Sequence, residues 1–409
     1  MKIGLMAYHY ACNFGATLQL LSTYMYLKNH GHTPLIINYV APDLKEFYAK
    51  TAPAAQIEML TALRKTIWHE SALCSNDNDI ARVINDEGID AVIIGSDAVT
   101  QHHPLRERIV FPCKRIIAIR KNTSNLEFPN PLWGTWMDCL KKDIPVAVMS
   151  ASSQDSKYKL IPKSTRKEMR KYVSRYSYLS VRDEWTRDMF AYITDGDIVP
   201  DVTPDPVFAF NQNAGALCPT KEDITARFNL PDHYILLSFT NKPKLASVDQ
   251  TWLDDFAKLA AADGKECISL PFATGKSLGK LRREIALPLS PIDWYALIKY
   301  SDGYVGNNMH PIVVSLHNAV RFFSFDNYGT TRLNSFLSDD SSSKIKHILT
   351  MAGLAGYRVS AIARGYRAPA ASDVYARLAA FNTAKSNAFA AKYLELYNHM
   401  MDDILAKLS

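Results

Sequence analysis

The chain has 409 residues, enough for two or three domains of ordinary size, each with its own core. Hydrophobic residues make up 47% of it and charged residues 22%, which is the balance of a soluble globular protein. The formal net charge of +6 fits an acidic substrate or an anionic membrane surface. No long basic block accompanies this charge, so it gives little support for nucleic-acid binding.

The six cysteines are scattered and form no C-x-x-C pair. This spacing argues against a zinc site and a disulfide scaffold, and it favours a reducing compartment. The N-terminal apolar run is too short and too interrupted for a signal peptide, and no run approaches the roughly 20 residues that span a bilayer. We therefore expect a cytoplasmic protein that can touch the inner face of a membrane without crossing it.

The first half of the chain alternates short apolar runs with segments of helical periodicity. Residues 3–8 predict a buried strand, residues 16–29 a helix and residues 35–39 a second strand. Such an opening predicts parallel strands joined by a right-handed crossover. The stretch 41–85 reads as mostly helical. The further elements expected in this half are strands at 90–94, 145–150, 178–181 and 198–202 and helices at 163–174 and 185–192.

A polar stretch rich in Asn, Gln, Gly and Pro, residues 211–231, predicts a hinge. The alternation resumes beyond it, so we expect an α/β fold of two Rossmann-like domains, residues 1–212 and 232–345, that face each other across a cleft. Helices over residues 346–409 are expected to pack on both domains. The elements expected beyond the hinge are strands at 233–239, 266–271, 303–305 and 320–325 and helices at 248–262, 291–300, 344–352 and, as one or two helices, 372–408.

The segment 302–328 reads as strand, turn, helix and strand, and its turn carries Asn308 and His310. In an open α/β sheet, ligands bind where the carboxyl ends of strands turn into helices. Helix N-termini also attract anions, because their N–H groups and dipole point outward. His310 can therefore bind an anion or move a proton, although a histidine that only caps the turn fits the spacing equally well.

Two turns in the first half also place polar residues at strand ends. Asn13 and Gly15 follow the first strand, but the G-x-G-x-x-G fingerprint of dinucleotide binding is absent, and Gly15 alone is most simply a turn residue. Ser96 and Asp97 follow the strand at 90–94. A carboxylate there can contact a substrate, although an N-cap for the next helix is the simpler local interpretation.

Arg182 follows the predicted strand at residues 178–181. An arginine in that position can hold a phosphate or a carboxylate by a two-pronged contact. Pairing with the neighbouring Asp183 or Glu184 accounts for it equally well.

Six stretches, taken in order, resemble the polysaccharide pyruvyl transferase family, and together they cover roughly Met1 to Arg358. The first is similar to the family's N-(Y/F)-G-A-x-L-Q opening and the second to its G-S-D turn. The stretches are YHYACNFGATLQLLSTYMYLKNHGH, VIIGSDAVTQ, SVRDEWTRDM, PDVTPDPVF, IDWYALIKYSDGYVGNNMHPIVVSLHNAVRFFSF and KIKHILTMAGLAGYR.

The resemblance implies a two-domain fold like that of GT-B glycosyltransferases. It also implies that the carboxyethylidene unit of phosphoenolpyruvate moves to a sugar, usually as a cyclic ketal across two hydroxyls, with release of phosphate. The implied partners are phosphoenolpyruvate, on the C-terminal domain, and a sugar or lipid-linked oligosaccharide of a capsule, exopolysaccharide or cell-wall glycan, on the N-terminal domain. No cofactor, metal or nucleic acid is expected.

Carried onto this sequence, the resemblance makes His310 the phosphoenolpyruvate-binding general acid and Arg182 a donor-binding residue. Three positions depart from the family pattern. Pro311 replaces the usual glycine after the histidine, and Asn308 stands where some members have an arginine that holds the donor. Residues 98–100 replace Q-x-W after the G-S-D turn, where acceptor contacts are expected.

The departure at Asn308 leaves the donor short of one positive charge, which Lys242, Lys244 or Arg332 can supply. In the expected chemistry the histidine protonates the methylene carbon of the donor, and a sugar hydroxyl attacks the resulting centre. Asp97 is the candidate base for that hydroxyl. The other candidates for substrate contacts are Asn13, Gly15, Ser96, Asn308 and Tyr328.

The aromatic residues Trp133, Trp136, Tyr8 and Tyr328 can stack on sugar rings, although core or loop packing is the simpler interpretation of each. Two other functions remain open. A nucleotide-sugar glycosyltransferase on the same architecture requires a base-reading pocket and a diphosphate clamp in the second domain. A catalytically inactive glycan-binding protein is the other alternative, and phosphate release from phosphoenolpyruvate separates the first interpretation from both.

Overall fold

The computed structural model describes the chain except residues 114–115, 241–247, 276–279, 333–336 and 363–364. Its strands are β1 (Lys2–Met6), β2 (Thr33–Ile36), β3 (Ala91–Asp97), β4 (Ile109–Cys113), β5 (Ile116–Ile119), β6 (Val146–Ala151), β7 (Tyr178–Val181), β8 (Asp201–Val202), β9 (Tyr234–Ser238), β10 (Glu266–Ser269), β11 (Arg283–Glu284), β12 (Gly303–Gly306), β13 (Arg321–Asp326), β14 (Thr330–Arg332), β15 (Leu337–Asp339) and β16 (Arg358–Ser360).

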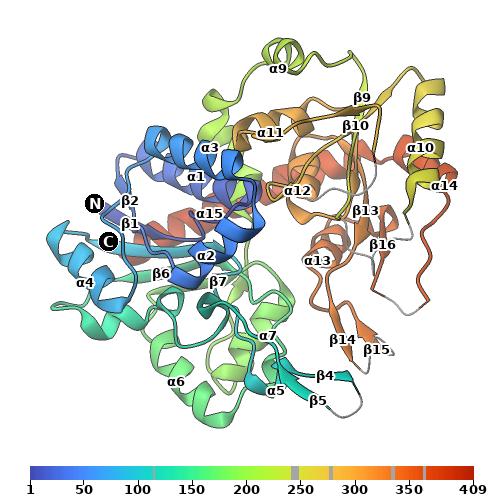
Figure 1. The fold of residues 1–409 in the computed structure, drawn as a ribbon. Coiled ribbons are helices and arrows are strands. Elements are labelled where there is room, and N and C mark those ends of the chain that lie inside the picture. The colour runs from blue at the N-terminus through green and yellow to red at the C-terminus, as the bar shows by residue number, and fades with distance from the viewer. Residues whose placement is uncertain (114–115, 241–247, 276–279, 333–336, 363–364) are drawn as a thin grey trace.

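The helices lie between these strands and cover their faces (Figure 1). They are α1 (Phe14–Asn29), α2 (Pro42–Thr51), α3 (Ala54–Ile67), α4 (Asp77–Asp86), α5 (Leu105–Arg108), α6 (Lys163–Val173), α7 (Glu184–Ile193), α8 (Phe210–Ala214), α9 (Lys221–Phe228), α10 (Gln250–Ala262), α11 (Pro291–Lys299), α12 (Met309–His317), α13 (Lys344–Met351), α14 (Ala371–Ala379) and α15 (Thr383–Leu408).

Two six-stranded sheets organise the molecule, one in each half (Figure 1). The first sheet has the order β2-β1-β3-β6-β7-β8 and the second the order β11-β10-β9-β12-β13-β16. Neighbouring strands run parallel in both sheets. The predicted α/β fold with two Rossmann-like halves and a helical C-terminal tail is confirmed.

Local sequence explains where several helices begin. Asn13 caps α1 by accepting from the backbone N–H groups of Gly15 and Ala16, and Asp183 caps α7 in the same way. Pro291 occupies the first turn of α11 after the N-cap Ser290, as the sequence predicts. Gly15 is therefore a residue of α1 and not the turn residue that the sequence indicated.

Three segments differ from the sequence-based expectations. The expected hinge at 211–231 folds into α8 and α9, because Thr220 and Asp223 form a capping box that starts α9 within a polar stretch. Strand β3 continues through Asp97, which therefore does not cap a following helix. The antiparallel hairpin β14–β15 projects from the loop that follows Tyr328.

The two halves share one hydrophobic core. Phe14 of α1 packs on Trp294 of α11 with ring centroids 5.4 Å apart. The buried amide of Gln56 in α3 donates to the carbonyl of Leu289 at 2.9 Å and accepts from its N–H at 2.7 Å. The two halves are therefore joined by apolar packing and by hydrogen bonds between the Gln56 side chain and the Leu289 backbone.

The tail consists of two helices that reach both halves. Helix α14 packs on α10 and β13, whereas α15 returns to the first sheet (Figure 1). There Met400 of α15 contacts Ser150 of β6. Strand β16, in the segment expected to be tail, forms an edge of the second sheet. Among the described residues, no helix has the length and apolarity needed to cross a bilayer.

Candidate active site

A cavity of about 940 Å³ lies between the two halves, and its lining includes residues of both. Asn13 and Asp97 reach it from the first half, and His310, Tyr328 and Lys344 reach it from the second. Two smaller cavities, of about 320 and 240 Å³, share Asn308 and Tyr328 with it. The tertiary structure thus brings together most of the side chains that the sequence singles out.

Three helices point their N-termini at this cavity. The N-cap residue of α1, Asn13, and the first residue of α13, Lys344, both line it. The first turn of α12 contributes Met309 and His310, and the side chain of its N-cap residue Asn308 makes no capping hydrogen bond. The first turn of α12, whose N–H groups have no side-chain cap, and the converging dipoles of the three helices make this part of the cavity suited to an anion.

Gly15 and His310 meet across the interface between the two halves. A Cβ atom added to Gly15 would lie 2.0 Å from Cγ of His310 and 2.1 Å from its Nδ1. Only glycine leaves room for the imidazole beside the first turn of α1. The sequence predicted both residues as candidates, but the contact between them is a tertiary feature that neither local pattern contains.

His310 is buried, with 6% of its surface exposed, and its Nε2 has no hydrogen-bond partner among the described residues. Burial lowers its pKa below the usual 6.5; Asp205 and Asp97 partly oppose this effect, whereas Arg182 and Lys344 add to it. The ring is therefore neutral near neutral pH when the cavity holds no anion. An unpaired ring nitrogen at an anion site can donate a proton once a ligand supplies negative charge.

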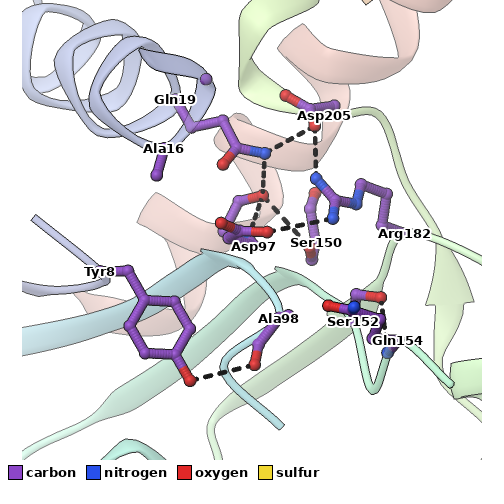
Figure 2. A network of polar contacts seen from close by, with 12 residues as sticks. Tyr8, Ala16, Gln19, Asp97, Ala98, Ser150, Ser152, Gln154, Arg182 and Asp205 are labelled. Atoms are coloured by element: carbon purple, nitrogen blue, oxygen red, sulfur yellow. Dashed lines mark hydrogen bonds and ion pairs between the residues drawn. The ribbon is translucent and has the colours of Figure 1, made fainter. Parts of the chain in front are cut away.

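Asp97 belongs to a buried network of hydrogen bonds and ion pairs with Arg182 at its centre (Figure 2). Arg182 donates to Asp205 at 2.6 Å and to Asp97 at 3.3 Å. Gln19 donates to the same Asp205 oxygen at 2.6 Å and to Ser96 Oγ at 3.2 Å. The network fixes the carboxylate of Asp97 at the wall of the cavity.

Burial alone would raise the pKa of Asp97, but the positive charges of Arg182 and Lys344 are the largest of the effects that outweigh it and lower the pKa. Its backbone is in the left-handed region, with φ of 79°. That conformation is uncommon for a residue with a side chain and persists only where the surroundings enforce it. Asp97 is thus held as an anion in one fixed orientation.

Lys344 is a site residue that the sequence reasoning missed. It is 5% exposed and lines the cavity, with its Nζ 5.9 Å from the ring centroid of Tyr328. Burial first, and then the charge of Arg182, lower its pKa to about 8. One signal was present, because a lysine in the first turn of a Ser-capped helix opposes the helix dipole.

A second ion pair, between a buried carboxylate and a partly buried arginine, holds the start of α13. The N-cap residue Ser343 donates its hydroxyl to Asp326, the last residue of β13, and Arg358 donates to the same carboxylate. Arg358 also donates to Asp340 at 2.7 Å. These contacts fix the position from which Lys344 enters the cavity.

The other predicted residues lie in different places. Asn13, Asn308 and Tyr328 line the cavity, whereas Ser96 is buried behind it and hydrogen-bonds with Gln19 and Ser150. Trp133 and Trp136 are fully buried core residues, which agrees with the simpler interpretation of each. Lys242 and Lys244 lie outside the described residues, and the side chain of Arg332, in β14, is not described.

The structure gives Arg182 two carboxylate partners and leaves it 4% exposed, behind Asp97. Direct contact between Arg182 and a donor stays a prediction. Within the described part of the chain, no cluster of three or more His, Cys, Asp or Glu side chains could hold a metal ion.

Comparison with solved structures identifies the class of fold. The chain resembles the UDP-GlcNAc 2-epimerase of Neisseria meningitidis bound to UDP-GlcNAc, with a TM-score of 0.56 at 10% identity over 99% of this chain and 100% of that one. It also resembles the UDP-N-acetylglucosamine 2-epimerase of Rickettsia bellii, with a TM-score of 0.53 at 11% identity over 100% of this chain and 97% of that one. At such identities the likeness shows the fold alone, which is the GT-B arrangement of two Rossmann-like halves.

No curated relative matches the sequence. The sequence pattern of the polysaccharide pyruvyl transferase family matches residues 13–328, which is more than half of the chain. The match begins at Asn13, the cap of α1, and ends at Tyr328, so it contains Gly15, Asp97 and His310. The GT-B fold and this match agree with the resemblance of the ordered sequence motifs, and the chain belongs to the polysaccharide pyruvyl transferase family.

Proposed function

We propose that the protein transfers the carboxyethylidene unit of phosphoenolpyruvate to two hydroxyls of a sugar in a surface polysaccharide or its lipid-linked precursor. The product is a pyruvate ketal, and phosphate is released. The observation that carries this proposal is the meeting of His310, Lys344 and Asp97 at one cavity into which three helix N-termini point.

The donor occupies the cationic end of the cavity. Phosphoenolpyruvate carries a phosphate and a carboxylate, so it needs several N–H donors and at least one cation. Lys344 supplies the cation that Asn308 does not, and the first turn of α12, which has no side-chain cap, supplies N–H groups. We assign to Arg182 the support of Asp97, with which it already pairs.

Binding of the donor also favours the protonated form of His310, the proposed general acid. A trianionic ligand beside the imidazole favours its charged form, so the pKa of His310 rises when phosphoenolpyruvate enters. The proton of His310 goes to the methylene carbon of the donor, and the carbon that bears the phosphate becomes electrophilic.

The two hydroxyl protons complete the balance. The first sugar hydroxyl attacks the electrophilic carbon and gives up its proton. This proton replaces the one that His310 delivered to the methylene carbon of the donor. The second hydroxyl displaces phosphate, which leaves with the second proton as hydrogen phosphate. Asp97 accepts a hydrogen bond from the attacking hydroxyl; its low pKa makes orientation, rather than strong basicity, its main contribution.

The experiment compares the wild type with His310→Gln and, as a matched control, with His399→Gln on the exposed face of α15. Calorimetry should detect binding of phosphoenolpyruvate with net proton uptake, and no binding of UDP-N-acetylglucosamine. In His310→Gln we expect donor affinity to fall, because the charged imidazole is lost, and phosphate release at saturating donor with a mixture of sugar acceptors should fall by about two orders of magnitude or more.

Each outcome separates the candidates. Tight binding of UDP-N-acetylglucosamine in place of phosphoenolpyruvate would support a nucleotide-sugar enzyme, an alternative that the likeness in fold suggests. Donor binding without phosphate release from any sugar would support the inactive glycan-binding alternative. Undiminished release in His310→Gln would remove the histidine from the chemistry.

A further inference from the structure

The outer part of the 940 Å³ cavity differs in chemistry from the end that holds His310 and Lys344. It extends from Asp97 toward α2 and the segment around residue 124. Aromatic rings and carboxamides make up much of its lining, and we call this part the aromatic-amide limb. Its aromatic and carboxamide residues are Tyr8, Phe47, Tyr48, Gln101, Asn122 and Asn125, and Asp43, Glu46, Lys50 and Lys121 also line it.

Two carboxamides in the limb each have a buried atom that makes no hydrogen bond to the described residues. Asn125 is 5% exposed and donates from Nδ2 to the Tyr8 hydroxyl at 3.0 Å, but its Oδ1 has no partner among the described residues. The Nδ2 of Asn122 is also buried and has no described partner. A buried amide atom without a partner destabilises the protein, so an unpaired acceptor and an unpaired donor here indicate a ligand with hydroxyl groups.

The aromatic side of the limb presents rings to the same space. Tyr48 lies beside Phe47, with ring centroids 5.5 Å apart at 70°, and Phe47 leaves 48% of its surface exposed. Ring faces next to paired amide donors and acceptors suit a sugar, which has an apolar face of C–H groups and an edge of hydroxyls.

The charges of the limb balance. Asp43 and Glu46 line it together with Lys50 and Lys121, so the acids and the lysines are equal in number. Glu46 pairs with Lys50, and Asp43 accepts from the backbone and hydroxyl of Ser124. The limb therefore has no excess cation to select an acidic sugar, in contrast to the end with Lys344.

The limb leads directly to the predicted chemistry. The hydroxyl of Tyr8 donates to the carbonyl of Ala98, the residue after Asp97, at 3.3 Å (Figure 2). Tyr8, Tyr48 and Asp97 all line the same cavity. A sugar in the limb would thus present its hydroxyls to Asp97.

We propose that the aromatic-amide limb binds an uncharged pyranose, with Asn125 and Asn122 on its hydroxyls and Tyr48 against its ring face. That this pyranose is the acceptor rests on the proposed function, whereas sugar binding by the limb does not. The residues named belong to α2 and to the segment 122–125 of the N-terminal half, away from the donor end.

The experiment measures sugar binding directly, by saturation-transfer NMR with p-nitrophenyl glucoside, galactoside, mannoside and N-acetylglucosaminide at millimolar concentration, and p-nitrophenyl glucuronide as the charged comparison. The proteins are the wild type, Asn125→Ala, Tyr48→Ala and the control Asn78→Ala, whose asparagine is exposed on α4 outside the cavity. Thermal unfolding verifies that each variant is folded.

We expect at least one uncharged pyranoside to bind the wild type and the control, and to bind Asn125→Ala and Tyr48→Ala about tenfold more weakly or not at all. The proposal is overturned if folded variants bind as the wild type does, if the glucuronide binds best, or if no pyranoside binds the wild type. Should Asn125→Ala fail to fold, Tyr48→Ala still tests sugar binding by the limb.

Calorimetry with phosphoenolpyruvate on the same four proteins keeps the two proposals apart. Donor affinity that persists while sugar binding is lost supports both. A wild type that binds a pyranoside but not phosphoenolpyruvate leaves the limb as a sugar site and overturns the donor assignment alone.

Discussion

The side chain of Lys344 is buried at the first position of α13, where the positive end of the helix dipole disfavours a cation. Burial and the charge of Arg182 lower its pKa from the usual 10.5 to about 8. Since the unfolded chain keeps the higher pKa, a charged Lys344 makes folding less favourable at neutral pH. Residues that reduce stability in this way are typical of binding and catalytic sites, where function opposes stability.

Lys344→Met should therefore stabilise the fold while it weakens donor binding. The difference between 10.5 and about 8 corresponds to about 3 kcal/mol, so we expect the free energy of unfolding at neutral pH to rise by about 1–3 kcal/mol. The gain should be largest below the folded pKa and should vanish as pH rises through the unfolded one. Urea unfolding at several pH values measures it.

The control is Lys346→Met on the same helix, because Lys346 is exposed and forms an ion pair with Asp340 at the surface. Removal of an exposed ion pair should change the free energy of unfolding by less than about 1 kcal/mol. Equal effects of the two substitutions, or destabilisation by Lys344→Met, would contradict the conclusion that burial of the charged Lys344 reduces stability.

At the scale of elements, the decisive contact is between the first turns of α1 and α12. The Asn-x-Gly pattern at the start of α1 has two separate causes: Asn13 caps the helix, and Gly15 makes space for His310. Neither helix could approach so closely with a larger residue there, and His310 would then leave the cavity wall.

Gly15→Ala should lower both the melting temperature and the affinity for phosphoenolpyruvate. In an ordinary helix this substitution stabilises by up to about 1 kcal/mol, so a loss would come from the contact with His310. Gly215→Ala serves as the matched control, because a Cβ there meets nothing within 4 Å. A Gly15→Ala protein with wild-type stability and donor affinity would show that the two helices separate at no cost.

At the scale of the whole molecule, the cleft depends on how firmly the two halves are joined. The shared core and the two hydrogen bonds of Gln56 to Leu289 connect them. We expect the two halves to unfold together, in one calorimetric transition, because separation would expose the common core.

Gln56→Leu tests this connection. The substitution leaves the buried N–H and C=O of Leu289 without partners and should lower the free energy of unfolding by about 1–3 kcal/mol. Gln250→Leu is the control, because Gln250 makes the same pair of contacts to the backbone of Lys280 at an exposed position within one half. If Gln56→Leu and Gln250→Leu lower the free energy of unfolding by similar amounts, the Gln56 contacts stabilise the protein no more than a surface contact does, which would contradict their role in joining the halves.

The sequence by itself determined the elements and the family. Alternating apolar runs and helical periodicity placed nearly every strand of the two sheets, because these signals depend on residues close together in the chain. The candidate residues at strand ends, among them Asp97 and His310, were also predictable, since parallel strands end at a common edge. The helices α8 and α9 were missed because a short capping box resembles a polar linker.

Only the tertiary structure decided how these residues act. It made Gly15 a contact for His310, placed Arg182 between two carboxylates and brought Lys344 into the cavity. It also set the aromatic-amide limb beside Asp97. Burial and the distances between charges determine these roles, and both depend on which distant segments pack together. A local pattern can nominate a side chain, but it contains no information on the charges that the fold places around it.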